Sequence, residues 1–437
     1  MSTSRGAINV QRRMMSDQAT QYEAVIVGGG PAGITVVGNL LERKLSPILW
    51  VDDCFDGGRV NRLYREVPSN TKVKTFVDFA EALTPFRRIL GNMPSRSRWD
   101  EPSESDSVAT SKNDKLSELR GLDQEKGCKL SFAADMCLAL TEGLKTTPGV
   151  VAQQGRLEEA TLDENSSSPA QWAVRVSNPE SFEAVTSAGT KRLVLCTGAS
   201  PTLEPLPLEP HLISAQPLEL DTALSPTRLS QALFPEGPTT VAVIGASHSA
   251  ILVLMNLYHL ASTSKPDLRI RWLTRHSLRY AEYMDGWILR DNTGLKGEAA
   301  EWARQHLEPE TFKQSDVSNY VSRIDYQSGD EEGTFEENLQ GCNFYVQAIG
   351  YRPDPLPKMK TSGGKEITPY FDNERGTFTY VKESEGGSMG DLARLPGLYG
   401  GGIAFPERVV DPQGNVEHAV GFWKFMKFIK RVSPQWN

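Results

Sequence analysis

Residues 24–33 read AVIVGGGPAG, a short apolar strand that runs into a glycine-rich turn and then a helix. In the pattern Gly-x-Gly-x-x-Gly, the first glycine makes the tight turn and the second lets backbone N–H groups approach a pyrophosphate. The third lets the helix pack close to the strand. Gly28, Gly30 and Gly33 fill these positions, and Pro31 and Ala32 open the helix, whose N-terminus favours negative charge. The stretch therefore predicts a dinucleotide-binding unit.

The next predicted strand, residues 47–51, ends in two acids, Asp52 and Asp53. Asp52 follows Gly28 at close to the spacing of about 20 residues at which a carboxylate holds a ribose hydroxyl. Strand, glycine turn, helix, strand and acid occur in the order that dinucleotide binding requires. We expect both acids to belong to this first cofactor site.

A weaker copy of the unit lies deep in the chain, where residues 241–250 read VAVIGASHSA. Serine replaces the second glycine, which is a looser fit against a pyrophosphate, and alanine replaces the third, which is tolerated. Two units in one chain suggest two dinucleotides, FAD as the resident cofactor and a nicotinamide that exchanges. The expected nicotinamide-binding residues in this turn are Gly245, Ser247, Ser249 and Ala250.

The strand after the second turn, residues 268–273, is followed by Arg275, and no acid ends it. The planar guanidinium of arginine can hold two oxygens of a 2′-phosphate. The sequence therefore favours NADPH over NADH, although an ordinary surface arginine would look the same.

Composition limits the class of protein. The 437 residues carry a net charge of −8, and 39% of them are hydrophobic, which fits a globular enzyme and argues against nucleic-acid binding. No apolar run approaches the roughly 18 residues that span a bilayer. The five cysteines are scattered without a Cys-x-x-Cys, which excludes dithiol redox chemistry and indicates a reducing, cytoplasmic setting. Residues 1–16 resemble a mitochondrial transit peptide weakly, and a disordered tail over 1–21 is the favoured interpretation.

Two predicted strands, residues 191–201 and 344–354, bracket the second glycine turn. We therefore expect an α/β fold of two doubly wound, Rossmann-like domains, with the NADPH domain inserted in the FAD domain. The predicted ranges are 22–225 for the first part of the FAD domain, with a polar insertion at about 94–126, then 226–345 for the NAD(P)H domain, and 346–437 for the second part of the FAD domain.

The chain resembles two-dinucleotide-domain flavoproteins, and among them the flavin-containing and N-hydroxylating (class B type) monooxygenases. The order of the glycine turns and bracketing strands is the same after residue 21. A local match adds weight, because FDGGR at residues 55–59 precedes VPSNTKVKTFVDF at residues 67–79. The resemblance implies that Asn70 contacts the flavin ring or the nicotinamide. It also implies that Gly58 and Arg59 touch the FAD. Thr197, Gly198, Gly350 and Gly402, at the strand ends of the domain crossings and in the C-terminal strand segment, are further candidate cofactor-binding residues.

Two departures from that family stand out. Its histidine-bearing fingerprint is not visible ahead of the second glycine turn. The strand at residues 398–404 also lacks the acid that many disulfide-reductase-like flavoproteins place near the FAD ribityl chain. No subfamily is identified by the motifs.

The resemblance also implies a reaction. NADPH would reduce FAD, and the reduced flavin would form a C4a-(hydro)peroxide with O2 that oxygenates a small organic substrate. Lys72 is a candidate to stabilise negative charge or hold a phosphate, with a solvated surface cation as the alternative. We expect residues 415–426 to begin a helix whose N-terminus faces the flavin, with His418 as an acid, a base or a helix cap.

Two other functions stay open. The chain could be an FAD-dependent oxidase or dehydrogenase with weak or no nicotinamide use, which Ser247 and the missing fingerprint would suit. It could also be a non-catalytic redox sensor, because binding a dinucleotide is not catalysis. The residues identify neither the substrate nor the oligomeric state.

Overall fold

The structure is a computed structural model of the chain. It describes residues 20–91, 115–163, 171–177, 184–234, 237–327, 329–381 and 392–436. The predicted tail lies outside these ranges except for Thr20 and Gln21, which belong to strand β1. Residues 94–114 of the predicted insertion also lie outside the described residues.

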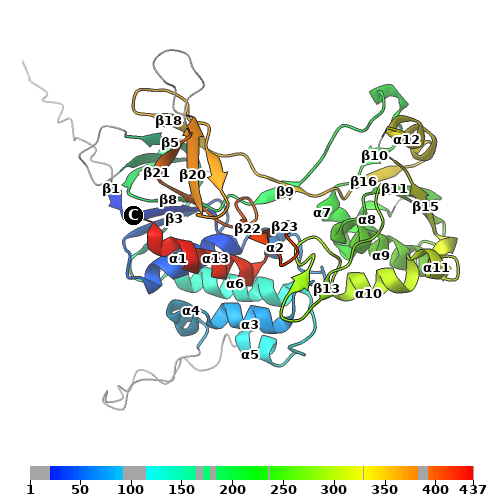
Figure 1. Cartoon of the computed structure of the whole chain (residues 1–437), viewed down its shortest axis with the longest axis horizontal. Helices are drawn as coiled ribbons and strands as arrows, with labels where there is room; N and C mark the ends of the chain where they lie inside the picture. The colour runs from blue at the N-terminus through cyan, green and yellow to red at the C-terminus, as the bar shows by residue number, and fades with distance from the viewer. Residues whose placement is uncertain are drawn as a thin grey trace, which may run out of the picture.

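A seven-stranded sheet forms the middle layer of the first lobe, in the order β19-β20-β21-β8-β2-β3-β4 (Figure 1). The five strands from β21 to β4 run parallel, and β20 and β19 extend the sheet antiparallel. The strands are β2 (Ala24–Val27), β3 (Ile48–Asp52), β4 (Val150–Gln154), β8 (Leu193–Leu195), β19 (Tyr370–Asp372), β20 (Thr377–Val381) and β21 (Leu392–Gly400).

Helices cover one face of this sheet and a second sheet covers the other. Because side chains alternate along a strand, Ala24 and Ile26 of β2 face the helices while Val25 faces the second sheet. The helices of this lobe are α1 (Pro31–Glu42), α2 (Arg59–Arg62), α3 (Val73–Glu81), α4 (Thr84–Ile89), α5 (Lys115–Arg120), α6 (Leu130–Lys145), α13 (Phe422–Val432) and η3 (Ser433–Gln435). The second sheet contains β1 (Thr20–Tyr22), β7 (Ala184–Thr190), β6 (Trp172–Ser177), β5 (Arg156–Leu162) and β18 (Lys358–Thr361).

The polar insertion expected at about 94–126 is wrong over its last part, because α5 lies there. Leu116 and Leu119 are one helical turn apart and are buried against the helical layer of the first lobe. Two leucines among charged neighbours were enough to anchor this short helix, although the composition of the segment is that of a solvated loop.

The second lobe is built on a five-stranded parallel sheet in the order β10-β16-β11-β12-β15. Its strands are β10 (Gln216–Pro217), β11 (Thr239–Ile244), β12 (Leu268–Thr274), β15 (Val321–Asp325) and β16 (Phe344–Gln347). One face packs on α7 (Leu220–Ala223), α8 (Pro226–Ala232), α9 (His248–Thr263) and α10 (Gly297–His306), and the other on α12 (Glu331–Leu339). The lobe also contains α11 (Pro309–Phe312), η1 (Pro210–Leu212) and η2 (Asp316–Asn319). Helices on both faces of a parallel sheet confirm the doubly wound fold.

A two-stranded ribbon connects the lobes. Strands β9 (Ala199–Pro201) and β17 (Tyr351–Pro353) pair antiparallel, so the chain enters and leaves the second lobe along one path (Figure 1). The sheet of this lobe reaches beyond residues 226–345 at both ends, since it includes β10 and the end of β16. The exact boundaries remain predictions. Two hairpins complete the fold, β13 (Glu282–Tyr283) with β14 (Ile288–Leu289) and β22 (Glu407–Val410) with β23 (Val416–Ala419).

Within the described ranges, no helix has both the length and the apolar character needed to cross a membrane. All five cysteines lie in the described part of the chain and are free thiols.

Candidate functional site

The first glycine turn connects β2 to α1 and requires glycine at two positions. Gly28 has a φ of +114°, and a Cβ there would lie 2.2 Å from the carbonyl oxygen of Cys196. A Cβ on Gly33 would lie 1.8 Å from the carbonyl oxygen of Gly28. Gly30 differs, because the nearest atom to its Cβ position is 3.9 Å away. The protein itself leaves open the side of Gly30 that a pyrophosphate would approach.

Two other glycines meet this turn where Pro31 starts α1. Gly58, the residue before α2, has a φ of +76°, and its Cβ position is 2.8 Å from the Cα of Gly30. Gly402 has a φ of +97°, and its Cβ position is 2.5 Å from the Cβ of Ala32. Three segments far apart in sequence thus place glycines, which carry no side chain, beside one helix N-terminus. Their exposed backbone fits the diphosphate of a dinucleotide.

Among the described residues of the first lobe, five buried side-chain polar atoms lack a hydrogen-bond partner. Two of them, Arg59 Nε and Thr197 Oγ1, belong to residues that directly follow Gly58 and Cys196, which meet the glycine turn. The guanidinium of Arg59 forms an ion pair with Asp221 and lies 3.4 Å from the hydroxyl of Tyr64. Buried polar groups are nearly always hydrogen-bonded, so these atoms point to a missing ligand group. Arg59 therefore fits the FAD-binding role expected of it, and Thr197 fits the cofactor-binding role expected of it.

The two acids after β3 have different partners. Asp52 accepts hydrogen bonds from the backbone N–H groups of Gly29 at 2.6 Å, Phe55 at 2.6 Å and Cys54 at 2.9 Å. Its carboxylate therefore holds the glycine turn against the end of β3. Asp53 instead pairs with Arg156 at 3.2 Å. The ribose contact stays a prediction for both.

The second glycine turn repeats the geometry of the first. Gly245 has a φ of +124°, and its Cβ position is 2.5 Å from the carbonyl oxygen of Ala348. The hydroxyl of Ser247 donates to that same oxygen at 2.8 Å and accepts from the N–H of Ala250 at 3.3 Å, capping α9. Because this hydroxyl is bonded inside the fold, serine at the second position is compatible with the turn.

A pair of tryptophans that the sequence interpretation missed strengthens the repeat. The indole N–H of Trp50 donates to the carbonyl of Gly28 at 2.9 Å, and that of Trp272 donates to the carbonyl of Gly245 at 2.8 Å. Each tryptophan pairs in its sheet with the residue two positions before the first glycine. The sequence did carry a signal for this pair. In each unit, a tryptophan stands just before the end of the strand that follows the glycine turn.

The remaining cofactor candidates lie around the second turn and the ribbon. Arg275 directly follows β12 at the carboxyl end of the second sheet and is exposed. Ser249 is hydrogen-bonded to Tyr351 of the ribbon. Gly198 and Gly350, with φ of +87° and +124°, lie in the turns beside the two ribbon strands. These positions suit a nicotinamide dinucleotide outside the strand ends, and that role stays a prediction.

A tyrosine pair links the two turns. Tyr64 donates to Asp221 at 2.8 Å and lies 3.4 Å from the hydroxyl of Tyr351. Burial raises the pKa of both tyrosines, so both are neutral donors at physiological pH. Through Arg59 and Ser249 this pair connects the first glycine turn to the second glycine turn, and no motif in the sequence had indicated it.

The structure separates the predicted catalytic residues. The exposed Asn70 lies where the lobes meet, with its Cα 3.8 Å from the Cβ position of Gly297 at the start of α10. The ammonium group of Lys72 pairs with Glu125 at 2.6 Å, and 45% of its side chain is exposed. This placement is that of the solvated surface cation.

The expected helix start around His418 is wrong. Residues 416–419 form strand β23, where His418 is exposed and pairs with Arg408 of β22. Helix α13 begins only at Phe422, after Gly421 with a φ of +141°. The β-branched Val416 and Val420 on either side of His418 favour the hairpin over a helix.

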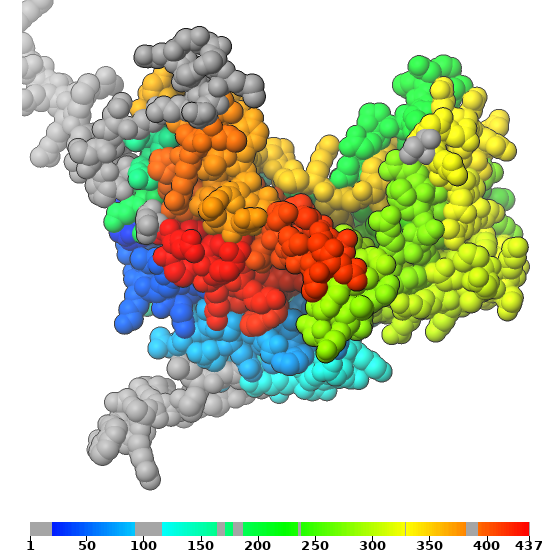
Figure 2. All heavy atoms as spheres, viewed as in Figure 1, coloured from blue at the N-terminus to red at the C-terminus, as the bar shows by residue number. Residues whose placement is uncertain are grey.

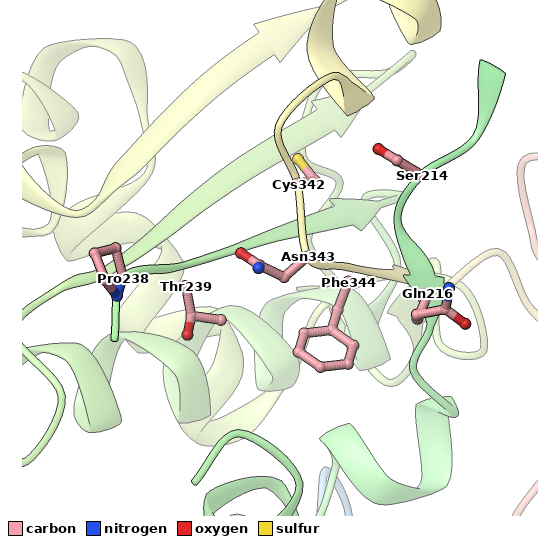
Figure 3. A pocket seen from close by; sticks show the side chains of 7 residues that line it. All are labelled: Ser214, Gln216, Pro238, Thr239, Cys342, Asn343 and Phe344. Carbon is pink, nitrogen blue, oxygen red and sulfur yellow. The ribbon is translucent and has the colours of Figure 1, made fainter. Parts of the chain in front are cut away.

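Figure 2 shows a hollow between the two lobes, which touch again below it, where β22–β23 meets the segment after β14. A separate cavity of about 370 Å³ lies at the other end of the second sheet (Figure 3). Its lining includes Thr239, the first residue of β11, whereas the glycine turn follows Ile244, the last residue of that strand. Ligands of open α/β sheets bind at the carboxyl ends of strands, so this cavity is not the cofactor site. No cluster of metal-ligating side chains occurs among the residues that the structure describes.

Comparison with known proteins places this architecture. No protein-family model matches the chain. Monooxygenase AgnR1 from Paecilomyces divaricatus is 49% identical over 414 residues, which cover 94% of this chain and 97% of AgnR1. The chain belongs to the same monooxygenase family. The protein is accordingly an enzyme, an oxidoreductase of the monooxygenase type.

Solved structures agree on the fold. A flavin-containing monooxygenase from Stenotrophomonas maltophilia matches with a TM-score of 0.51 at 11% identity, over 95% of this chain and 98% of that chain. A mutant flavin monooxygenase from the same organism matches with the same TM-score at 12% identity and the same coverage. At this identity the likeness shows the fold alone, which is that of flavoproteins with two dinucleotide-binding domains.

Proposed function

We propose that the protein is an FAD-dependent monooxygenase that uses NADPH and O2 to oxygenate a small organic substrate. The observation that carries the proposal is the repeated turn: both glycine turns have the same backbone strain, the same carbonyl contact and the same indole hydrogen bond. Membership of the monooxygenase family supplies the reaction class.

The first turn is the FAD site in this proposal. Gly28, Gly30 and Gly33 with Gly58 offer bare backbone to the diphosphate, and Arg59 supplies a charged donor whose Nε still needs a partner. Bound FAD would supply the redox chemistry, taking a hydride from NADPH and activating O2 as a C4a-(hydro)peroxide. The protein contributes binding, orientation and exclusion of water.

The second turn is the NADPH site in this proposal. Backbone N–H groups at the start of α9 face the diphosphate, and Arg275 is offered to the 2′-phosphate. The internal bonding of Ser247 favours this function over an oxidase that had lost nicotinamide binding, because serine does not obstruct the turn. Asn70, at the meeting of the lobes, is proposed to contact the reacting rings.

The test is anaerobic rapid mixing of FAD-loaded protein with NADPH, with NADH as the matched control, followed by admission of O2. We expect NADPH to bleach the flavin absorbance faster than NADH, and O2 to restore it through a peroxyflavin absorbance. Reoxidation without that absorbance would indicate an oxidase. Absence of bleaching by either nucleotide would overturn the proposal.

A further inference from the structure

A half-buried group of charged residues joins the two lobes away from the ribbon. The carboxylate of Asp291, in the segment after β14 of the second lobe, lies between the ammonium groups of Lys296 and Lys424. Lys424 is in the first turn of α13 in the first lobe, and its Nζ is 2.8 Å from Asp291 Oδ2. The same Nζ donates to the side-chain oxygen of Asn292 at 2.6 Å.

A second carboxylate holds the adjacent turn. Glu417 of β23 is only 8% exposed and accepts three hydrogen bonds from the second lobe. The donors are the backbone and side-chain N–H groups of Asn292, both at 3.1 Å, and the hydroxyl of Thr293 at 2.5 Å. We call this group the Asp291 cluster, and it consists of Asp291, Asn292, Thr293, Lys296, Glu417 and Lys424.

The electrostatics of the cluster depend on its being complete. Burial lowers the pKa of Lys424, and the attraction of Asp291 opposes that loss. Burial would raise the pKa of Asp291, but hydrogen bonds from Lys296 and Lys424 outweigh it and the pKa lies below its ordinary value. Removing one charge leaves its partner unpaired in a partly desolvated place, which is unfavourable. The cluster therefore holds the lobes in one relative position.

The cluster also adjoins the candidate nicotinamide site, because α10, which follows Lys296, packs against α9. Lys296 is the residue before α10, and burial together with the Lys296 charge lowers the pKa of His248 to about 4. His248 is the first residue of α9, directly after the second glycine turn, and its Nδ1 is buried without a partner among the described residues. On the other side, Gly297 packs against the backbone of Asn70. The cluster thus lies between the second glycine turn and the predicted flavin-facing residue.

We propose that Asp291 and Lys424 are positioning residues, which hold the second glycine turn, and the nicotinamide bound there, in register with the first lobe for hydride transfer. This inference rests on the proposed function. Displacements of about 1 Å between reacting groups can lower a rate by about a hundredfold. The expected defect is therefore in the limiting rate of flavin reduction rather than in binding of FAD or NADPH, whose proposed diphosphate contacts lie within each lobe.

The experiment uses the full-length FAD-loaded protein with the variants Asp291→Asn and Lys424→Met and the double variant. The matched control is Glu142→Gln, which breaks an exposed ion pair with Lys145 within α6 and does not bridge the lobes. Anaerobic stopped-flow over a range of NADPH concentrations gives the limiting rate and the apparent Kd. X-ray scattering on the same samples gives the radius of gyration.

We expect the limiting rate to fall about a hundredfold in each single variant, with no further fall in the double variant and little change in the apparent Kd. The radius of gyration should increase, and the Glu142→Gln control should match the wild type. If a charge variant does not fold, Thr293→Val removes one donor to Glu417 and should give a smaller fall in the same direction.

Unchanged limiting rates in variants of a reducible wild type would overturn the positioning role. If the wild type itself is not reduced by NADPH, the proposed function fails, and the scattering measurement alone then decides on the cluster. An unchanged radius of gyration in Asp291→Asn and Lys424→Met would in that case overturn it.

Discussion

Replacing Gly30 with alanine should separate flavin binding from folding. The φ of −79° and ψ of −175° at Gly30 suit an alanine, and its Cβ would meet no atom closer than 3.9 Å. Because alanine also restricts the unfolded chain, Gly30→Ala should raise the stability of the apoprotein by up to about 1 kcal/mol. The same methyl group would occupy the space through which the backbone reaches the diphosphate.

The binding defect can be estimated from the contacts at stake. A diphosphate pushed away from the turn loses one or two charge-assisted hydrogen bonds, each worth about 1.5–3 kcal/mol. A loss of about 3 kcal/mol corresponds to about a hundredfold weaker binding. Quenching of flavin fluorescence on titrating apoprotein into FAD measures the affinity, and chemical denaturation of the apoprotein measures the stability.

Gly33→Ala is the contrasting variant. Its Cβ would lie 1.8 Å from the carbonyl oxygen of Gly28, so we expect loss of the fold as well as of FAD binding. The reasoning would be refuted if Gly30→Ala bound FAD as the wild type does, or if it destabilised the apoprotein as much as Gly33→Ala.

Three further predictions concern the second lobe and its repeat. Arg275→Ala should weaken NADPH about tenfold and leave NADH unchanged, as measured by apparent Kd, and equal effects on both would contradict a 2′-phosphate contact. Trp50→Phe and Trp272→Phe should each lower the free energy of unfolding by about 1–3 kcal/mol in chemical denaturation, because a buried carbonyl loses its donor. A stability equal to the wild type would mean that the indole bonds are dispensable. Burial lowers the pKa of His248 from 6.5 to about 4, so its stability contribution is full above pH 6.5 and is lost as the pH falls toward 4. His248→Gln should flatten the stability profile over that range, and an identical slope in both proteins would refute the assignment.

The sequence was sufficient for the features that depend on local chemistry. Both glycine turns, their strands and their helices follow from patterns of about ten residues, in which turn geometry and apolar alternation act together. The insertion of the second lobe also followed, because the segments 191–201 and 344–354 bracket it, and the last strand of each, β9 and β17, pairs with the other as the ribbon. Helix α5 did not, since it owes its structure to the tertiary packing of Leu116 and Leu119. Strand β23 did not either, although the β-branched residues around His418 favour a strand.

The contacts between lobes could not be predicted in the same way. Asp221 meets Arg59, and Glu417 meets Asn292, across more than a hundred residues of chain. No spacing rule connects such pairs, and each residue alone resembles an ordinary surface polar group. Lys72 shows the converse, because a motif made it a candidate for the site with a solvated surface cation as the alternative, and the fold pairs it with Glu125 at the surface.

The ribbon between the lobes makes the inserted second lobe resemble an exchangeable module. The N–H of Thr202 donates to the carbonyl of Gly350 at 2.9 Å, so the two ends of the inserted lobe leave side by side. An insertion of this kind can be exchanged between related proteins, because its ends fit the same pair of attachment points. Its independence is incomplete, since Tyr64, Val67 and Leu130 of the first lobe pack against its apolar core. A transplanted lobe would therefore need a host that supplies these three side chains as well as the ribbon.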